Sequence, residues 1–237
     1  MAQLQGKEKS RYVQDMFGRI AGRYNLMNRL MTGGQDQRWR RYTIQKAAIP
    51  PNGRVLDLAT GTGDIAFEAL RQQPSAEVIG ADFALPMMIV GQRQKLGHHV
   101  GWAGADALNL PFPDNTFDAV TSGYLVRNVP DIHQTLREKL RVLKPGGRMV
   151  ILDSSPPPNN LLRPFIMIHL KYIIPLMGRL ISGKQGADAY RYLPESTQSF
   201  KTPDELTAIM QSVGVRDVAF KVFMFGTMAI HWGVKPE

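Results

Sequence analysis

The sequence contains no cysteine. This absence excludes disulfide frameworks, thiolate metal sites and a cysteine nucleophile, and it fits a cytoplasmic protein. Residues 1–7 also lack the apolar run of a signal peptide, so we expect the chain to stay in the cytoplasm. The histidines lack ligand spacing with nearby acidic residues, and we therefore expect no metal site. The chemistry that remains uses neither a thiol nor a bound metal.

Acidic residues are scarce in the first 54 residues, which contain eleven Lys or Arg and only three Asp or Glu. This region therefore carries +8 of the formal net charge of +9. A concentrated basic region is typical of a protein with an anionic partner, either nucleic acid or an acidic membrane surface. A solvated helical face explains the same charge without a partner, and composition alone leaves both explanations open.

A chain of 237 residues is long enough for one sizeable core and short for two domains. Its 43% apolar and 21% charged residues are typical of a soluble globular protein. We expect a single domain over residues 1–237. Within it, residues 1–50 form a basic helical N-terminal segment, and residues 156–200 form an apolar and basic, lid-like insertion.

Short apolar runs alternate with helical patterns along the chain. The β-type runs lie at 55–59, 76–82, 99–102, 117–121 and 148–153, with two more at 217–225 and 227–234. Helical patterns lie near 64–72, 85–96, 131–143 and 203–212. Continuous apolar strands separated by helices indicate a parallel sheet covered on both faces. The sequence predicts an α/β fold, with a doubly wound, mostly parallel seven-stranded sheet, an N-terminal helical segment and a helical insertion after the fifth strand.

The first strand leads into a turn of small residues, Asp57–Asp64 (DLATGTGD), which lets a ligand approach the backbone closely. Residues 61–66 also fit the dinucleotide fingerprint GxGxxA, a weak match on its own. Asp64 places a carboxylate at a helix N-terminus, where a pyrophosphate would otherwise bind. Asp57, before the glycines, suits a cationic sulfonium ligand. The turn therefore favours S-adenosylmethionine over NAD.

Two further acids follow the second and third strands. Asp82 can accept both ribose hydroxyls, and Asp106 can accept from the adenine amine. Phe83 and either Met87 or Met88 are placed to flank the adenine plane. Helix capping by the acids and core packing by the methionine are the plainer alternatives. Ligands in open α/β sheets bind at the carboxyl ends of the strands, which favours the donor site.

Several motifs together resemble a known family. They are Tyr24–Asn28 (YNLMN), Arg38–Arg41 (RWRR), Asp57–Asp64, Leu110–Asp118 (LPFPDNTFD), Arg127–Val129 (RNV), Arg141–Arg148 (RVLKPGGR) and Tyr190–Ser196 (YRYLPES). The chain resembles class I methyltransferases and, across nearly its whole length, the ubiquinone/menaquinone biosynthesis C-methyltransferase family. The resemblance implies methylation of a ring carbon of a prenylated demethylquinol by S-adenosylmethionine, with demethylmenaquinol to menaquinol as the first choice.

The resemblance also implies a donor site and an acceptor site. The donor-site residues are Asp57, Ala59, Thr60, Gly61, Thr62, Gly63, Asp82, Phe83, Met87, Asp106, Ala107, Ser122 and Gly123. The acceptor-site residues are Asn28, Tyr124, Arg191 and Tyr192, with Tyr24, Arg127 and Asn128 as catalytic candidates.

Three departures from the family pattern bear on the acceptor site. Asp36 stands where the family often has a histidine. Gly123 and Leu125 replace the usual serine and glycine around the aromatic residue of their loop. Asp153–Ser155 (DSS) replaces a Glu-Phe-Ser-like end of the fifth strand.

The chemistry of carbon methylation gives Arg127 and Asn128 a role of their own. A ring carbon is a poor nucleophile until an adjacent hydroxyl loses its proton, and the resulting phenolate needs a fixed cation or good hydrogen-bond donors. Both residues follow the fourth strand on the donor's side of the sheet. The plainer alternatives are a salt bridge for Arg127 and a helix N-cap for Asn128, near Pro130.

The segment 161–181 is apolar but interrupted by Arg163, His169, Lys171, Pro175 and Arg179, which argue against a membrane span. It can cover a greasy substrate tail, lie at a membrane interface, or form ordinary core helices over the sheet. We expect a prenylated quinol as substrate and a peripheral contact with the inner face of the cell membrane, and we leave a homodimer open.

Two rival functions differ in class. A nucleic-acid base methyltransferase explains the basic N-terminus, but the loop Ser122–Leu125 (SGYL) lacks the Asp/Asn-Pro-Pro-aromatic element of exocyclic-amine methylation. We therefore expect no nucleic-acid partner. A non-catalytic scaffold that binds S-adenosylmethionine is disfavoured by the intact turn with Asp82 and Asp106, and a turnover measurement decides between scaffold and enzyme.

Overall fold

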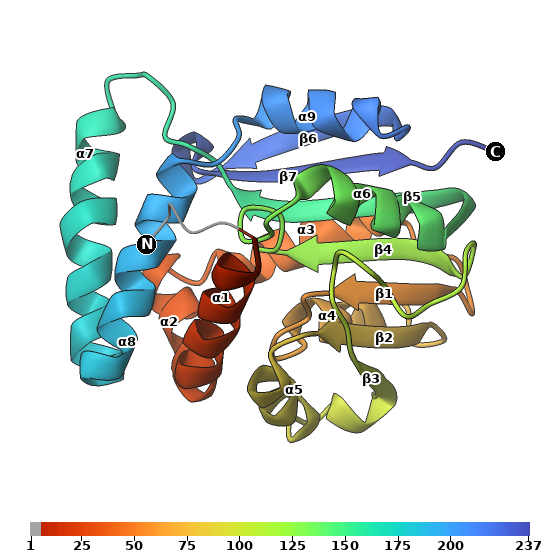
Figure 1. Cartoon of the computed structure of the whole chain (residues 1–237), viewed down its shortest axis with the longest axis horizontal. Helices are drawn as coiled ribbons and strands as arrows, with labels where there is room; N and C mark the ends of the chain where they lie inside the picture. The colour runs from red at the N-terminus through yellow and green to blue at the C-terminus, as the bar shows by residue number, and fades with distance from the viewer. Residues whose placement is uncertain (1–5) are drawn as a thin grey trace.

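A computed structural model describes residues 6–237, apart from the side chains of residues 7, 182–188, 191 and 193. Its centre is one seven-stranded sheet in the order β3-β2-β1-β4-β5-β7-β6 (Figure 1). The strands are β1 (Arg54–Leu58), β2 (Glu77–Asp82), β3 (Val100–Gly104), β4 (Phe117–Gly123), β5 (Leu143–Ser154), β6 (Arg216–Phe223) and β7 (Met228–Val234). β1 to β5 pair in parallel, and β7 is antiparallel to both of its neighbours. The predicted mostly parallel, seven-stranded sheet is confirmed.

Helices cover both faces of the sheet because the central strands are apolar on both sides. Val55 packs on the face covered by α3 (Asp36–Ala47) and α4 (Asp64–Gln72). Its neighbour Leu56 packs on the opposite face, under α6 (Ile132–Val142) and α9 (Pro203–Ser212). Successive side chains of a strand point to opposite faces, so a strand buried on both faces has to be apolar throughout. Beyond β2, α5 (Leu85–Gln92) completes the doubly wound arrangement.

The remaining helices gather at the carboxyl ends of the parallel strands, on the left in Figure 1. The N-terminal segment forms α1 (Gly6–Ile20), the short η1 (Ala21–Arg23) and α2 (Tyr24–Met31). The insertion after β5 forms α7 (Arg163–Ile168), a π-helical turn η3 (His169–Ile173) and α8 (Ile174–Gln198). The two groups share one apolar cluster that includes Val13, Met16, Leu170 and Ile174. Both predicted helical segments are therefore present.

The insertion folds back on itself as a helical hairpin. A Cβ added to Gly178 would lie 2.5 Å from the side chain of Tyr190. In a straight helix, positions twelve residues apart would be about 18 Å apart, so the chain reverses between them. Glycine at 178 leaves room for the tyrosine ring of the returning arm. Figure 1 shows the two arms as neighbouring helices.

The first arm of this hairpin exposes most of its apolar residues. By length and composition alone Arg163–Ile181 could cross a membrane, and 6% of its most apolar window is buried. Phe165 is 72% exposed and Leu180 is 76% exposed. The alternative that this segment forms ordinary core helices over the sheet is therefore wrong.

A lysine side chain lies inside the core. Lys139, on α6, is fully buried, and its Nζ donates a hydrogen bond to Ser122 Oγ at 2.8 Å. Burial lowers the pKa of Lys139 to about 7, although Asp57 and Asp153 favour its charged form. Ser122 was predicted to contact the donor, but its hydroxyl lies against this lysine.

Replacing the buried amine tests its effect on stability. The unfolded chain keeps this proton up to about pH 10.5, whereas the folded protein releases it near pH 7. The unfolded state thus binds more protons between these values, so Lys139 makes the unfolding free energy of the parent rise with pH across this window. We expect Lys139→Met to be more stable than the parent at pH 7, by on the order of 1–4 kcal/mol.

The stability advantage of Lys139→Met over the parent should shrink as the pH approaches 10. Urea denaturation of both proteins at about pH 7 and about pH 9.5 measures it. A stability difference that is independent of pH would mean that the amine stays charged in the folded protein.

Candidate functional site

Three cavities meet where the parallel strands end. Two small ones, of about 40 and 120 Å³, lie beside the turn after β1 and the end of β2. We call these the donor cavities. A larger one, of about 400 Å³, lies between the sheet and the helical hairpin, and we call it the acceptor cavity.

A buried carboxylate, that of Asp57, stabilises the turn after β1 through hydrogen bonds. Asp57 accepts hydrogen bonds from Thr60 Oγ1 at 2.7 Å and from Thr121 Oγ1 at 3.0 Å. Its burial raises the pKa of Asp57 to about 6, against the opposing effect of these hydroxyls. Gly61 and Gly63 have φ of +56° and +85°, a region that favours glycine. Asp57 and Thr60 thus shape the turn from beneath it.

Asp82 connects this turn to the end of β2. Its two carboxylate oxygens accept from the backbone N–H groups of Gly61 and Ala84, both at 2.8 Å. Burial raises the pKa of this carboxyl despite these bonds. Asp82 lines both donor cavities, and each oxygen has a second lone pair for a ligand hydroxyl.

The other expected donor residues divide between the two donor cavities. Ala59 and Phe83 line both, Gly61, Met87 and Gly123 line the smaller one, and Asp106 and Ala107 line the larger one. Asp106 Oδ1 also accepts from the N–H of Leu108 at 2.9 Å, but this bond lies in a turn between β3 and β4, so the helix-capping alternative for Asp106 is wrong.

Thr62 and Asp64 face the N-terminal helices instead. Thr62 donates to Asn25 Oδ1 at 2.8 Å, and Asp64 pairs with Arg40 at 3.0 Å. Arg40 pairs equally with Asp36, which is 1% exposed. Asp36, at the family's histidine position, therefore orients an arginine that anchors the donor turn, and it does not line the acceptor cavity.

Helix α1 covers the donor cavities, a feature that the sequence analysis missed. Ser10, Val13 and Phe17 line them. Gln14 Nε2 donates to the carbonyl of Phe83 at 2.6 Å, and Lys9 Nζ donates to the carbonyl of Val129 at 2.9 Å. The amphipathic pattern of residues 6–20 predicts a helix with one buried face, but the sequence of this segment does not indicate what that face packs against.

Tyr24 and Tyr124 border both the acceptor cavity and the smaller donor cavity. Burial raises the pKa of both phenols, so each hydroxyl stays protonated at neutral pH. Tyr124 has φ of +59°, an uncommon backbone conformation for a bulky residue. A group that moves between donor and acceptor has to pass these two rings. Asn28, which was also predicted for the acceptor site, lines the acceptor cavity.

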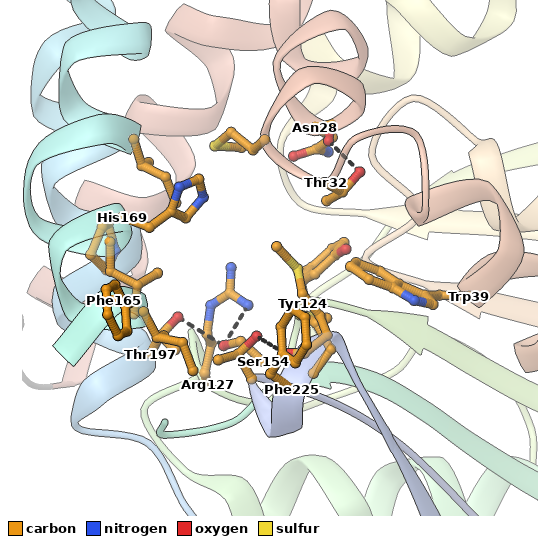
Figure 2. Close-up of a pocket in the computed structure, with 18 of the residues that line it drawn as sticks. Asn28, Thr32, Trp39, Tyr124, Arg127, Ser154, Phe165, His169, Thr197 and Phe225 are labelled. Atoms are coloured by element: carbon orange, nitrogen blue, oxygen red, sulfur yellow. Dashed lines mark hydrogen bonds between the residues drawn. The ribbon is translucent and has the colours of Figure 1, made fainter. Parts of the chain in front are cut away.

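Arg127 brings a positive charge to this otherwise apolar cavity. Its Nη1 donates to Asp153 Oδ1 at 2.8 Å and to Ser154 Oγ at 3.0 Å. The guanidinium lies 5.1 Å from the centre of the Tyr124 ring and extends into the cavity (Figure 2). Its Nε is buried and has no hydrogen-bond partner among the described residues. The expected salt bridge is therefore present, and Arg127 also lines the acceptor cavity.

Asn128 and Tyr192 hold the loop between the cavities. Asn128 Nδ2 donates to the carbonyl of Tyr124 at 2.7 Å, and the Tyr192 hydroxyl donates to Asn128 Oδ1 at 3.1 Å. The N-cap of α6 is Asp131, so the capping alternative for Asn128 is wrong. Asn128 lines the donor cavities, and Tyr192 lines none of the three. The side chain of Arg191 lies outside the described residues.

A sequence profile described as the ubiE/COQ5 methyltransferase family matches residues 5–235. The chain belongs to this family. It is 51% identical to the ubiquinone/menaquinone biosynthesis C-methyltransferase UbiE of Desulfotalea psychrophila, over 94% of this chain and 90% of that protein. It is 46% identical to the demethylmenaquinone methyltransferase of Thermus thermophilus, over 93% of this chain and 100% of that protein.

Solved structures agree on the fold. Phosphoethanolamine N-methyltransferase 2 of Haemonchus contortus, in complex with S-adenosyl-L-methionine, matches with a TM-score of 0.63 at 16% identity. The match covers 84% of this chain and 53% of that one. A methyltransferase of Thermotoga maritima matches with a TM-score of 0.60 at 18% identity, over 93% and 98% of the two chains. The class I methyltransferase fold predicted from the sequence is confirmed.

The donor cavities of this family member fit S-adenosylmethionine, its methyl donor. A buried carboxylate at the end of β2 faces them, as a ribose diol requires. A Cβ on Gly61 would come within 3.2 Å of Met87 Cε, so glycine keeps this side of the turn open. Individual donor contacts remain predictions.

Removing the charge of Asp82 tests the ribose contact. Asp82→Asn keeps the shape of the side chain but replaces one acceptor oxygen with a donor that faces backbone N–H groups. We expect S-adenosylmethionine to bind about 10- to 100-fold more weakly, as measured by titration calorimetry.

Glu77→Gln, at the exposed opposite end of β2, is the matched control and should bind like the parent. Unchanged affinity in Asp82→Asn would contradict the ribose assignment. Tighter binding of NAD than of S-adenosylmethionine by the parent would contradict the donor itself.

Proposed function

We propose that this methyltransferase transfers the methyl group of S-adenosylmethionine to a ring carbon of a prenylated demethylquinol, with demethylmenaquinol as the acceptor. The observation that carries the proposal is the acceptor cavity, which is apolar, holds Arg127, and meets the donor side at two tyrosines. The printed names of the relatives from Desulfotalea psychrophila and Thermus thermophilus support the same substrate class. An apolar cavity suits a hydrophobic ring better than a nucleic-acid base carried on a charged backbone.

The reaction needs an electron-rich ring. The hydroxyl beside the reacting carbon loses its proton, and the positive guanidinium of Arg127 stabilises the phenolate that forms. The ring carbon then forms a bond to the methyl group while the bond between methyl and sulfur breaks. The same ring carbon then releases its hydrogen as a proton, which restores the aromatic ring, and the phenolate oxygen takes up a proton, so that one proton is released overall for each methyl group transferred. S-adenosylmethionine supplies the activated methyl group, and the two tyrosine rings and the hairpin exclude water from the path.

The fixed position of Arg127 suits this role. Asp153 accepts from both the backbone N–H and the side chain of Arg127, at 3.2 and 2.8 Å. One edge of the guanidinium is thereby occupied, while Nε has no partner among the described residues. The guanidinium charge is fixed in a low-dielectric cavity, where it attracts a phenolate more strongly than it would in water.

We extend the proposal to where the enzyme works. The first arm of the hairpin carries exposed apolar residues, and exposed basic residues lie among them. The apolar residues are Leu161, Leu162, Phe165, Ile168, Tyr172, Ile173, Leu176 and Leu180, and the basic ones are Arg163, Lys171 and Arg179. Apolar side chains flanked by cations favour an anionic bilayer surface.

The same arm forms a wall of the acceptor cavity. Leu162 and Phe165 are exposed and also line the cavity. A prenyl tail could therefore pass from a bilayer into the cavity along one continuous apolar surface. This supports a peripheral position at the cytoplasmic face of the membrane.

Removing the cation tests the carbon-methylation mechanism. Loss of Arg127 alone would leave Asp153 buried and unpaired, at a cost of roughly 3–5 kcal/mol. We therefore combine Arg127→Met with Asp153→Asn, which removes both charges. With a short-chain demethylmenaquinol kept reduced, we expect turnover to fall about 100- to 1000-fold. Donor affinity should change far less, because the amide oxygen introduced by Asp153→Asn can still accept from the backbone N–H of residue 127 and so hold the loop.

The control for this pair is Lys144→Met with Asp118→Asn, which removes a 2.8 Å ion pair away from the cavities. Equal rates of the parent with oxidised and reduced acceptor, or a product methylated on oxygen, would contradict the carbon-methylation mechanism.

The membrane contact is tested with charges on the exposed arm. Leu176→Glu with Leu180→Glu alters two exposed residues that do not line the acceptor cavity. We expect this variant to lose co-sedimentation with anionic vesicles but to keep activity on a detergent-solubilised short-chain acceptor. Binding of the parent should weaken as salt rises.

Leu85→Glu, exposed on α5, is the control and should sediment like the parent. Preferential binding of the parent to structured RNA over vesicles at matched salt would favour a nucleic-acid partner instead.

A further inference from the structure

The acceptor cavity contains further buried nitrogen groups besides Arg127, those of Asn28 and His169. His169, in η3, lines the cavity, and its Nε2 is buried without a hydrogen-bond partner among the described residues. Figure 2 shows its imidazole pointing into the cavity from the hairpin, while the Arg127 guanidinium enters from the sheet side. Arg127 Nε is likewise buried without a partner. Two walls of one apolar cavity thus each present a buried polar atom.

A buried polar atom without a partner costs free energy, so each one in a native protein calls for an explanation. The helical neighbours of His169 on its cavity side are the apolar Phe165, Ile166 and Leu170, and none of these side chains can supply a hydrogen bond. A ligand in the cavity can supply it. A ring with hydroxyls at opposite ends could reach both walls at once.

We infer that His169 hydrogen-bonds the second ring hydroxyl of the acceptor, the one para to the hydroxyl that Arg127 stabilises. The inference rests on the proposed function. The assignment of the two ends follows from position, because Arg127 lies over Tyr124, which also borders the donor cavity. His169 lines only the acceptor cavity and comes from the opposite wall. The reacting end of the ring therefore faces Arg127, and the far end faces His169.

This contact adds a selectivity that Arg127 alone does not give. A hydroxyl both donates and accepts, so it can bond to imidazole Nε2 in either tautomer, whereas the carbonyl of an oxidised ring can only accept. A carbonyl can therefore bond only to the Nε2–H tautomer, and a hydrogen in its place bonds to neither, so His169 favours rings that carry two hydroxyls. It contacts the ring without taking a proton from the reacting end, so it is a residue that determines specificity.

The test pairs a substrate change with a residue change. The two acceptors are a short-chain prenylated 1,4-dihydroxynaphthalene and its analogue in which hydrogen replaces the hydroxyl far from the reacting carbon. His169→Phe removes the nitrogen and keeps an aromatic ring of similar size. His169→Gln restores a side chain that can donate and accept.

We expect the parent to prefer the dihydroxy acceptor over the analogue by about tenfold or more in kcat/KM. His169→Phe should lose about this factor with the dihydroxy acceptor only, so that the preference disappears, and His169→Gln should recover part of it. Ile174→Val, a conservative change in the same wall, should keep the preference of the parent. Donor affinity should be the same in all four proteins.

Equal losses of His169→Phe on both acceptors would show a structural role and overturn the inference, as would an unchanged preference. Failure of the parent to methylate either acceptor would instead overturn the proposed function, and the inference with it.

Discussion

The site depends on one buried ion pair, between Arg127 after β4 and Asp153 at the end of β5. A guanidinium in an apolar cavity is costly to desolvate, and the carboxylate beside it offsets much of that cost. Because Asp153 also binds the backbone N–H of Arg127, it fixes the loop as well as the charge. The loop in turn carries Tyr124 and Asn128, which border the cavities. The position of the cation and the shape of both sites are thus set by the same carboxylate.

The sequence predicts those features that depend on the residues of a single strand or turn. Apolar runs bounded by glycine turns identify parallel strands, and an acid at the end of such a strand falls at the ligand-binding edge. Asp82 was placed at this edge in this way, and it lines both donor cavities. Arg127 was predicted from the chemistry of the phenolate, and it lines the acceptor cavity.

The misses arise where the partner of a side chain lies far along the chain. Tyr192 was expected at the acceptor but binds Asn128, 64 positions away. Ser122 was expected at the donor but binds Lys139, whose burial among apolar neighbours no local pattern announces. His169 was counted among the residues that interrupt an apolar segment. The packing of the hairpin against the rest of the protein places it in the acceptor cavity. Long-range packing, which a single sequence does not display, decides each of these.

The apolar cluster shared by α1 and the hairpin has a further consequence. Val13, Met16 and Ile20 of α1 pack in the same cluster as Leu170, Ile174 and Tyr190 of the hairpin. One of these elements covers the donor cavities and the other covers the acceptor cavity, so a displacement of either removes apolar contacts from its neighbour. Opening of the two covers is therefore energetically cooperative, and the entry of one substrate is not mechanically independent of the entry of the other.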